Sequence, residues 1–443
     1  MSGIKDILFA DTQHYQGKVD QRFLDLAVQF SRLQVSRGAL GGAALAVYFQ
    51  GELVVDIFTG NKSATEAWAQ DTLSICYSTG KGVLATLAHI MVSQGILDYD
   101  TPIMHYWPEF AQNDKENITL RHVLSHQSGL YDIRNMIAAA VEMADWPHML
   151  QVMERARPRF IAGQDIAYQA LSFGWLVGGV LEKASGQSLA ALMQQYLVKP
   201  LDLDGAYFGL PTDQLSRVAR MLPQSSLNSN FTTQTSTATS STAPSSTESA
   251  KTKTKAQSAI RKAKFKTSNI PQKLLEFSGQ NPQDFLDAMV PKAMRDFSFF
   301  SDVGLQSVIP AVNGAFSAVS LAKIYAMLAN QGQWQGQQLI NAEVFEQLSQ
   351  IQSFKRDRVM PIPMKWRLGY HRVISLGKRA KTGFGHIGYN GSGAWCDPER
   401  QLSFAYTHNF PVASITGDYR LWGLTQEALR CADAELKGRK GWF

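Results

Sequence analysis

The chain of 443 residues is long enough for one catalytic fold with an inserted subdomain. Its composition, 45% apolar and 18% charged, is typical of a globular protein and excludes disorder or a collagen-like fibre for the chain as a whole. Its apolar stretches are interrupted well before the roughly 20 residues that a bilayer span needs, so we expect no transmembrane helix.

The net charge of +6 is concentrated in one segment. Seven basic residues and no acidic residue lie between 251 and 266, shortly after a stretch, 225–249, in which 16 of 25 residues are serine or threonine. A segment with so few apolar residues cannot form a packed core, so we predict a disordered insertion over 224–268. An electrostatic tether to a membrane or a nucleic acid is an alternative interpretation; a solvated insertion is the simpler one, and we expect no nucleic-acid partner.

Residues 1–16 contain only a four-residue apolar run with an aspartate on each side. They lack the charged start and the long apolar stretch of a signal peptide, which predicts a cytoplasmic location. The three cysteines, Cys76, Cys396 and Cys431, are odd in number and form no CxxC pair. We therefore expect neither a disulfide framework nor a metal site.

Helix and strand patterns follow one another along the rest of the chain. Helical spacing of apolar residues predicts helices over 19–36, 78–97, 316–329 and 420–436. From about residue 102 to about residue 220, the pattern predicts helices separated by loops. The run 42–60 predicts an antiparallel hairpin around Gln50-Gly51. Two further strands are expected over 391–396 and 402–408, joined by a turn at residues 397–400.

Strands at both ends of the chain with helices between them predict an α/β protein of the α+β type. One antiparallel sheet, formed from both chain ends and flanked by helices, would belong to residues 1–100 and 305–443. A mainly helical part, 101–304, would be inserted between them within a single catalytic domain. The active cleft is expected between the two parts.

Ser78-Thr79-Gly80-Lys81 fits the pattern SxxK, which puts a serine nucleophile at a helix start and a lysine one turn later on the same face. The positive end of a helix favours an uncharged lysine, which can take the serine proton. SxxK also begins at three other serines: Ser2 near the start of the chain, Ser320 inside a helical pattern, and Ser375 before a loop. Only Ser78 stands where a strand-like run passes into an apolar helix; its alternative interpretation is an ordinary N-cap serine.

Five segments, the first of which contains this motif, follow one another along the chain: CYSTGKGVLATLAHIMVSQGILDYDTPIMHYWPEF, ITLRHVLSHQSGL, AYQALSFGWLVGGVLEKASGQSL, IPAVNGAFSAVSLAKIYAMLANQG and FGHIGYNGSGAWCDPERQLSFAYTHN. In this order they resemble the serine β-lactamase and penicillin-binding-protein-like superfamily, and specifically its class C-like esterase branch, the family VIII carboxylesterases. They cover most of the chain outside residues 210–300. The resemblance implies that Ser78 is the nucleophile and Lys81 its lysine partner.

The resemblance also implies that the family's second motif, Tyr-x-Asn, falls on Tyr168-Gln169-Ala170. Tyr168 would act as a phenolate or as a proton relay, provided that Lys81 lowers its pKa. Its alternative interpretation is a buried aromatic residue ahead of a helix. Alanine at position 170 replaces the asparagine that helps hold the substrate amide in β-lactam-hydrolysing relatives, which disfavours efficient β-lactam turnover.

The third motif of the family has two candidates, Lys381-Thr382-Gly383 and His386-Ile387-Gly388. Spacing to the Asp-Pro-Glu turn favours the second, with His386 and Gly388 at the substrate. The backbone N–H of Tyr389, on an edge strand, would then be the second oxyanion donor beside the N–H of Ser78. Asn313 matches a family loop near the cleft and is interpreted either as a turn residue or as a substrate contact.

The resulting hypothesis is a serine hydrolase that cleaves short-chain carboxylic esters through an acyl-enzyme on Ser78, with no cofactor or metal. Its partner would be a small ester. A D-amino-peptidase or β-lactam hydrolase with the same machinery is the first alternative. The second is a non-catalytic scaffold that docks through the Ser/Thr-rich basic insertion.

Overall fold

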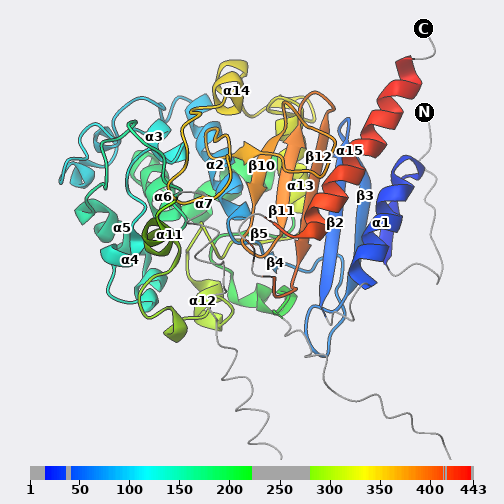
Figure 1. Cartoon of the computed structure of the whole chain (residues 1–443), viewed down its shortest axis with the longest axis horizontal. Helices are drawn as coiled ribbons and strands as arrows, with labels where there is room; N and C mark the ends of the chain where they lie inside the picture. Colours follow the sequence, from blue (N-terminus) through cyan, green and yellow to red (C-terminus); the bar gives the residue numbers. More distant parts are fainter. Residues whose placement is uncertain (1–14, 36–40, 222–279, 413, 415–416, 441–443) are drawn as a thin grey trace, which may run out of the picture.

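A seven-stranded antiparallel sheet forms the centre of the molecule (Figure 1). The computed structural model describes residues 15–35, 41–221, 280–412, 414 and 417–440, so the insertion predicted over 224–268 lies outside the described residues. The strand order is β1-β3-β2-β12-β11-β10-β9. The strands are β1 (Gln16–Val19), β2 (Gly42–Phe49), β3 (Glu52–Gly60), β9 (His371–Arg372), β10 (Phe384–Ile387), β11 (Gly393–Asp397) and β12 (Leu402–His408).

The two chain ends meet where β12 pairs with β2, with Leu402 opposite Phe49 and His408 opposite Ala43. The hairpin of β2 and β3 turns at Gln50-Gly51, as predicted, with positive φ angles at both turn residues. The structure thus confirms the expected antiparallel sheet built from both ends of the chain. Strand β1 ends at Val19, the first residue of the predicted helix 19–36. A short 3-10 helix follows, so the α-helix begins later than expected, at Leu24.

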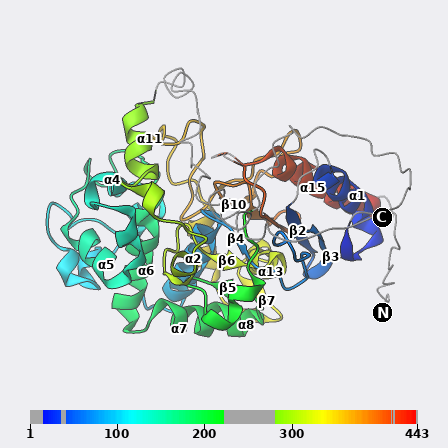
Figure 2. The same ribbon diagram turned by 90° about the horizontal axis from the view of Figure 1, so that it is seen from below.

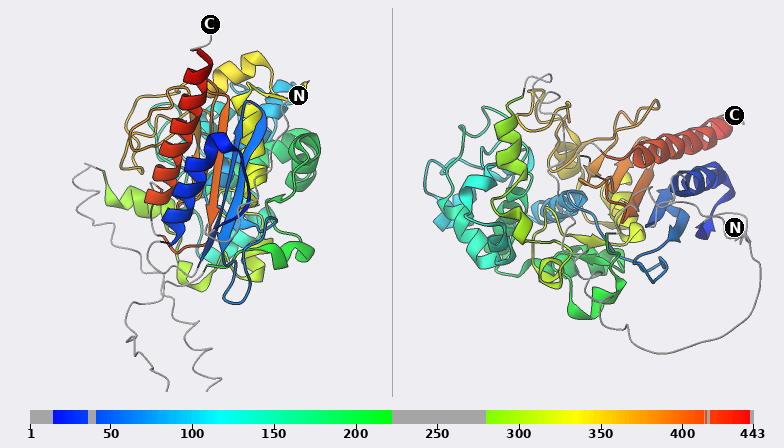
Figure 3. Two further views of the ribbon diagram at one scale, coloured as in Figure 1. Left: turned by 90° about the vertical axis from the view of Figure 1, so that its right-hand side faces the viewer. Right: turned by 60° about the horizontal axis from the view of Figure 1, so that its bottom comes forward.

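Helices cover both faces of this sheet. On one face, α1 (Leu24–Val35) and α15 (Tyr419–Lys440) lie side by side (Figures 1 and 3). On the other, α13 (Ala318–Ala329) packs against β2, β11 and β12, and the helical part of the chain lies beyond it (Figure 2). Because both faces are buried, β2 reads as an unbroken apolar run, in which Leu45, Val47 and Phe49 face α1 and α15 while alternate residues face the other core.

The remaining elements are short and mostly helical. The α-helices are α3 (Leu120–Leu124), α4 (Ile133–Met136), α5 (Trp146–Arg155), α6 (Ser172–Ser185), α7 (Leu189–Met193), α8 (Lys199–Leu201), α11 (Pro282–Met289), α12 (Asp302–Gln306) and α14 (Ala342–Ser349). The 3-10 helices are Gln21–Phe23, Ile103–His105, Pro108–Phe110, Ala140–Ala144, Thr212–Arg217 and Met294–Asp296, and Gln194–Val198 is a π-helix. Two small sheets complete the fold: β4 (Ser74–Ile75), β6 (Ala315–Phe316) and β5 (Ala206–Tyr207), and β7 (Gln333–Trp334) with β8 (Gln337–Gln338).

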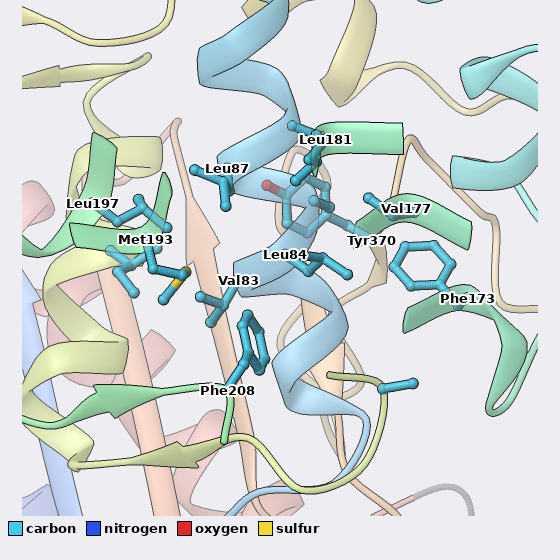
Figure 4. Close-up of a cluster of buried hydrophobic side chains, with 14 of the residues drawn as sticks. Val83, Leu84, Leu87, Phe173, Val177, Leu181, Met193, Leu197, Phe208 and Tyr370 are labelled. Carbon is cyan, nitrogen blue, oxygen red and sulfur yellow. The ribbon is translucent and has the colours of Figure 1, made fainter. Parts of the chain in front are cut away.

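Helix α2 (Thr79–Ser93) runs through the core between the sheet and the helical part. Val83, Leu84 and Leu87 pack against side chains from α6, from the segment around Leu197 and from Phe208 (Figure 4). Burial of each such leucine or valine stabilises the fold by about 1.5–3 kcal/mol. The helix ends four residues before the predicted end, because Gly95 takes up a left-handed backbone (φ 72°).

In the parts of the chain that the structure describes, no helix is both long and apolar enough to span a bilayer. The cytoplasmic location stays a prediction, since it depends on the first residues of the chain, which are not described.

Candidate active site

Ser78 stands directly before α2, after the short strand β4. The residue before it, Tyr77, has φ 47°, a backbone conformation that is costly for a residue with a side chain and that is frequent at functional sites. The hydroxyl of Ser78 makes no capping bond to the helix. Ser78 is thus the N-cap residue by position, but its side chain does not cap the helix and its oxygen is available for other partners.

Lys81 lies one turn along α2, with 0% of its side chain exposed. Its Nζ lies 2.9 Å from Ser78 Oγ and donates to the carbonyl oxygens of Ala170 and Ala311, at 2.7 and 3.0 Å. Burial lowers the pKa of Lys81 well below that of an exposed lysine. A neutral amine has two N–H bonds and one lone pair; the two carbonyls occupy the N–H bonds, which leaves the lone pair for the Ser78 hydroxyl.

Tyr168 comes from the loop before α6 and is 4% exposed. Its ring centre lies 5.0 Å from Lys81 Nζ. Burial raises the pKa of the Tyr168 phenol above its usual value, although a hydrogen bond with Ser78 lowers it in part. The condition for a phenolate, a pKa lowered by Lys81, is therefore not met, because a buried lysine that is itself neutral provides no charge to stabilise the anion. The phenol is present as the neutral O–H.

His386 lies on β10 with its side chain buried. Its Nδ1 donates to the Ile387 carbonyl at 3.0 Å, so its Nε2 is the acceptor of the neutral ring, and no described residue donates to it. Burial lowers the pKa of His386 well below its usual value, and nearby His371 and Lys81 lower it further. The ring is therefore neutral near pH 7.

The literal Lys381-Thr382-Gly383 lies apart from these groups. Lys381 is exposed, and the Thr382 hydroxyl donates to the Asp397 carboxylate at 2.6 Å. The triplet is the turn before β10, and this hydrogen bond connects it to the end of β11. Of the two candidates for the third motif, the structure thus brings His386, and not Lys381, to Ser78.

Two backbone N–H groups beside Ser78 have no acceptor among the described residues, those of Ser78 and Tyr389. Gly388 brings the end of β10 close to the segment before Ser78: a Cβ at this position would lie 2.3 Å from the Cys76 carbonyl oxygen, so only glycine allows this approach. Tyr389 follows the end of β10, which is not the sheet edge as expected. Strand β9 lies outside it but pairs only with Phe384 and Gly385, so no strand pairs with the end of β10 on that side.

Two predicted substrate contacts do not line the cavity beside Ser78. Asn313 lies away from the cavity wall, and its amide is fully used: Oδ1 accepts from Ile309 N–H at 3.0 Å, and Nδ2 donates to the carbonyls of Gly304 and Ser307 at 2.7 and 2.5 Å. The turn interpretation of Asn313 is therefore the right one. Gly388 also does not line the cavity; its N–H donates to the Ser392 carbonyl at 2.7 Å, and its contribution is the close approach to Cys76.

Ser78 opens onto a narrow cavity whose wall is mainly apolar. The space available to the centre of a water molecule is about 20 Å³, enough for one water and little more. The lining residues are Ser78, Tyr168, Met289, Met360, Met364, Trp366, His371, His386, Ile387 and Tyr389. The cavity therefore suits a small apolar group, and the flexible methionines allow it to adapt.

Several residues of this wall have no counterpart among the predicted site residues. Trp366 stacks on Tyr168 with 5.3 Å between ring centres and 8° between planes, and His126 packs edge-on against both rings. His371 accepts the Ile387 N–H at 3.0 Å through Nε2, which fixes the end of β10. Trp366 lies in a segment, 350–370, with neither helical nor strand periodicity, so its sequence contains no local signal of this role.

In the described part of the chain, no three histidine, cysteine or acidic side chains are grouped so that they could hold a metal ion. The groups that surround Ser78 are instead two buried bases, a phenol and two backbone N–H donors. This set can take a proton from a serine hydroxyl and stabilise a negatively charged oxygen.

Residues 21–425 match the Beta-lactamase family. The chain is 31% identical over 397 residues to the esterase/beta-lactamase LipL of Mycobacterium tuberculosis, which covers 89% of this chain and 82% of LipL. Among solved structures, it is similar to a family VIII carboxylesterase (25% identity, TM-score 0.75, 94% of this chain and 99% of that chain) and to a penicillin-binding protein homologue from Caulobacter crescentus (26%, 0.73, 94% and 99%). The chain belongs to the β-lactamase family, within the superfamily of serine β-lactamases and penicillin-binding-protein-like hydrolases.

Proposed function

We propose that this serine hydrolase is a carboxylesterase that cleaves short-chain esters through an acyl-enzyme on Ser78. The observation that carries the proposal is the contact of Lys81 with Ser78 Oγ at 2.9 Å, with both amine N–H bonds held by carbonyls. A lysine in this state is a base for the serine hydroxyl. The apolar cavity beside it is suited to a small acyl group.

In acylation, Lys81 takes the proton of the Ser78 hydroxyl while Oγ forms a bond to the ester carbonyl carbon. The carbonyl oxygen becomes an oxyanion, which the N–H groups of Ser78 and Tyr389 stabilise. The C–O bond to the alcohol then breaks, and the neutral phenol of Tyr168 gives its proton to the departing alkoxide. Lys81, now protonated, gives its proton to the Tyr168 phenolate, so that both groups are neutral again.

Deacylation repeats these steps with water in place of the serine. Lys81, which is neutral again, takes the water proton, and the hydroxide attacks the acyl carbonyl. The same two N–H donors stabilise the second oxyanion. The protonated Lys81 then gives its proton to Ser78 Oγ as the bond between Oγ and the acyl carbon breaks, and the carboxylic acid is released.

We expect kcat/KM for short-chain p-nitrophenyl esters to exceed that for nitrocefin by at least about 100-fold, or about 2.7 kcal/mol in transition-state stabilisation. Ala170 cannot hold an acylamino side chain, and a neutral His386 binds a substrate carboxylate less well than a charged lysine would. The check is a set of initial rates on esters of increasing acyl length, nitrocefin and D-Ala-D-Ala peptides. Comparable efficiency on esters and nitrocefin would refute the ester assignment.

A β-lactam or D-amino-peptide hydrolase is the second candidate, and two similarities favour it. LipL is described as both an esterase and a β-lactamase, and one structural neighbour is a penicillin-binding protein homologue. The same substrate panel decides between the two candidates, since both use the same nucleophile.

The third motif can be tested by substitution. We expect His386→Ala to lower esterase kcat/KM by about 10-fold or more, because it removes a side chain that lines the cavity and, with it, the acceptor Nε2. Lys381→Ala is the matched control and should stay within about 2-fold of wild type, since Lys381 is exposed and outside the cavity wall. The measurement is the rate on a p-nitrophenyl ester for both variants. A large loss in Lys381→Ala with none in His386→Ala would assign the motif to Lys381.

A further inference from the structure

A buried carboxylate lies behind the cavity wall, in the loop between α14 and β9. Asp357 is 4% exposed, and its backbone forms an isolated parallel bridge with Ile166, two residues before Tyr168. The neighbouring Arg358 does not neutralise it, since Arg358 pairs with Asp165 at 2.6 Å. Such a carboxylate needs hydrogen-bond donors to compensate for its burial.

Four N–H groups supply this compensation. Oδ1 of Asp357 accepts from the backbone N–H groups of Val359, Tyr168 and Met360, at 2.8, 3.1 and 3.1 Å. Oδ2 accepts from the indole N–H of Trp366 at 2.7 Å. All four partners are donors, so the arrangement fits the ionised carboxylate, although burial raises the pKa of Asp357.

The donors belong to the cavity wall. Tyr168, Met360 and Trp366 all line the cavity, and the Trp366 ring lies nearly parallel to the Tyr168 ring, with 8° between the planes. The carboxylate therefore holds Tyr168 twice, directly at its backbone N–H and indirectly through the ring stacked on it. Tyr168 lies in a loop, where these contacts replace the support that a helix or a strand would give.

We propose that Asp357 is a positioning residue for Tyr168, whose carboxylate fixes the loop of Tyr168 and the Trp366 ring relative to each other and so keeps the phenol at Ser78. The proposal rests on the function proposed above, in which Tyr168 transfers protons. Asp357 touches no substrate; it acts through Tyr168 and Trp366. A small displacement of such a group from its productive geometry is enough to lower a rate strongly.

Asp357→Asn tests the proposal with little change of volume. The amide keeps one oxygen for the backbone N–H groups, but its NH₂ faces the indole N–H of Trp366, so that two donors meet. We expect kcat on a p-nitrophenyl ester to fall by about 10-fold or more with KM changed by less than about 3-fold. Addition of Trp366→Phe, which removes the indole N–H and keeps a flat ring, should restore at least about 3-fold of the lost kcat.

Glu154→Gln is the matched control. Glu154, on α5, also accepts an indole N–H, that of Trp107 at 2.8 Å, but it does not line the cavity. Its kcat should stay within about 2-fold of wild type. A kcat within the same range in Asp357→Asn, or a double variant without any recovery, would overturn the proposal.

Two measurements keep the test decisive. If Asp357→Asn does not fold, Trp366→Phe alone cuts the same link. A kcat lowered by about 3-fold or more, with KM changed by less than about 3-fold, supports the proposal, while an unchanged kcat overturns it. If wild type hydrolyses no ester, the proposed function fails, and the rate of fluorophosphonate labelling of Ser78 becomes the readout for Asp357. That rate should fall by about 10-fold in Asp357→Asn and not in Glu154→Gln.

Discussion

Ser78→Ala is expected to lower ester hydrolysis by at least about 10⁴-fold, because no other group can form the acyl-enzyme. The substitution removes one oxygen and leaves the N–H groups of Ser78 and Tyr389 in place. The rate on a p-nitrophenyl ester measures the loss. When the wild-type enzyme is labelled with a fluorophosphonate, peptide mass spectrometry should locate the adduct on Ser78.

The other SxxK serines of the described chain are the controls. Ser320 lies in the first turn of α13, within the helix as its pattern indicated, and its N–H donates to Ser317 Oγ at 3.2 Å. Its Oγ donates to the Asp204 carbonyl at 2.7 Å, while Lys323 donates to the Asp202 carbonyl. Ser375 donates to the Lys378 carbonyl. Ser320→Ala and Ser375→Ala should therefore retain ester hydrolysis. An adduct on any serine other than Ser78 would refute the assignment of the nucleophile.

Lys81→Met is expected to lower kcat by about 10³-fold, since methionine fills much of the space of the lysine stem but cannot accept a proton. The pH profile provides a second test. Because burial lowers the pKa of Lys81, wild type should stay active as the pH falls towards that lowered pKa and lose activity below it, where the amine is protonated and has no lone pair. In Lys81→Met this acidic limb should be absent from the residual activity.

Lys115→Met separates catalysis from stability. Lys115 is also 0% exposed, and its Nζ donates to the carbonyls of Gln112, Glu154 and Ala156 at 2.8, 2.7 and 2.6 Å. Both substitutions leave buried carbonyls without their donor, so both should lower the free energy of unfolding, by about 1–3 kcal/mol for each carbonyl that is left unsatisfied. Only Lys81→Met should lower kcat in the folded enzyme. Equal losses of kcat in the two variants would contradict the role of Lys81 as the base.

Local sequence determined the parts of this protein that depend on near neighbours. The hairpin of β2 and β3, the strands β11 and β12 with the turn between them, and α2 all follow from periodicity and turn residues over fewer than 20 positions. Ser78 and Lys81 belong to this class, since three residues along a helix bring two side chains to the same face. The sheet built from both chain ends could be predicted as well, because its strands are strongly apolar and the sequence between them shows mainly helical patterns.

The tertiary structure supplied the burial that shifts the pKa values at the site. Lys81 is neutral because α2 is buried on every side and because Ala170 and Ala311, 89 and 230 positions away, supply carbonyls to its amine. The same burial raises the pKa of Tyr168, so the condition for a phenolate, a pKa lowered by Lys81, is not met, whereas the proton-relay alternative is compatible with it. A sequence pattern does not specify which groups lose water, and desolvation is the largest cause of both pKa changes.

Tertiary structure also decided which polar side chains face the cavity. Asn313 has an amide that could bind a substrate, yet this amide already forms hydrogen bonds with three backbone groups of its own loop. Asp357 and Trp366 lie in a segment without periodicity, and they reach Tyr168 only because that loop crosses the segment at Ile166. Contacts between residues almost 200 positions apart depend on how the whole chain packs, so neither motif spacing nor hydrophobic pattern could reveal them.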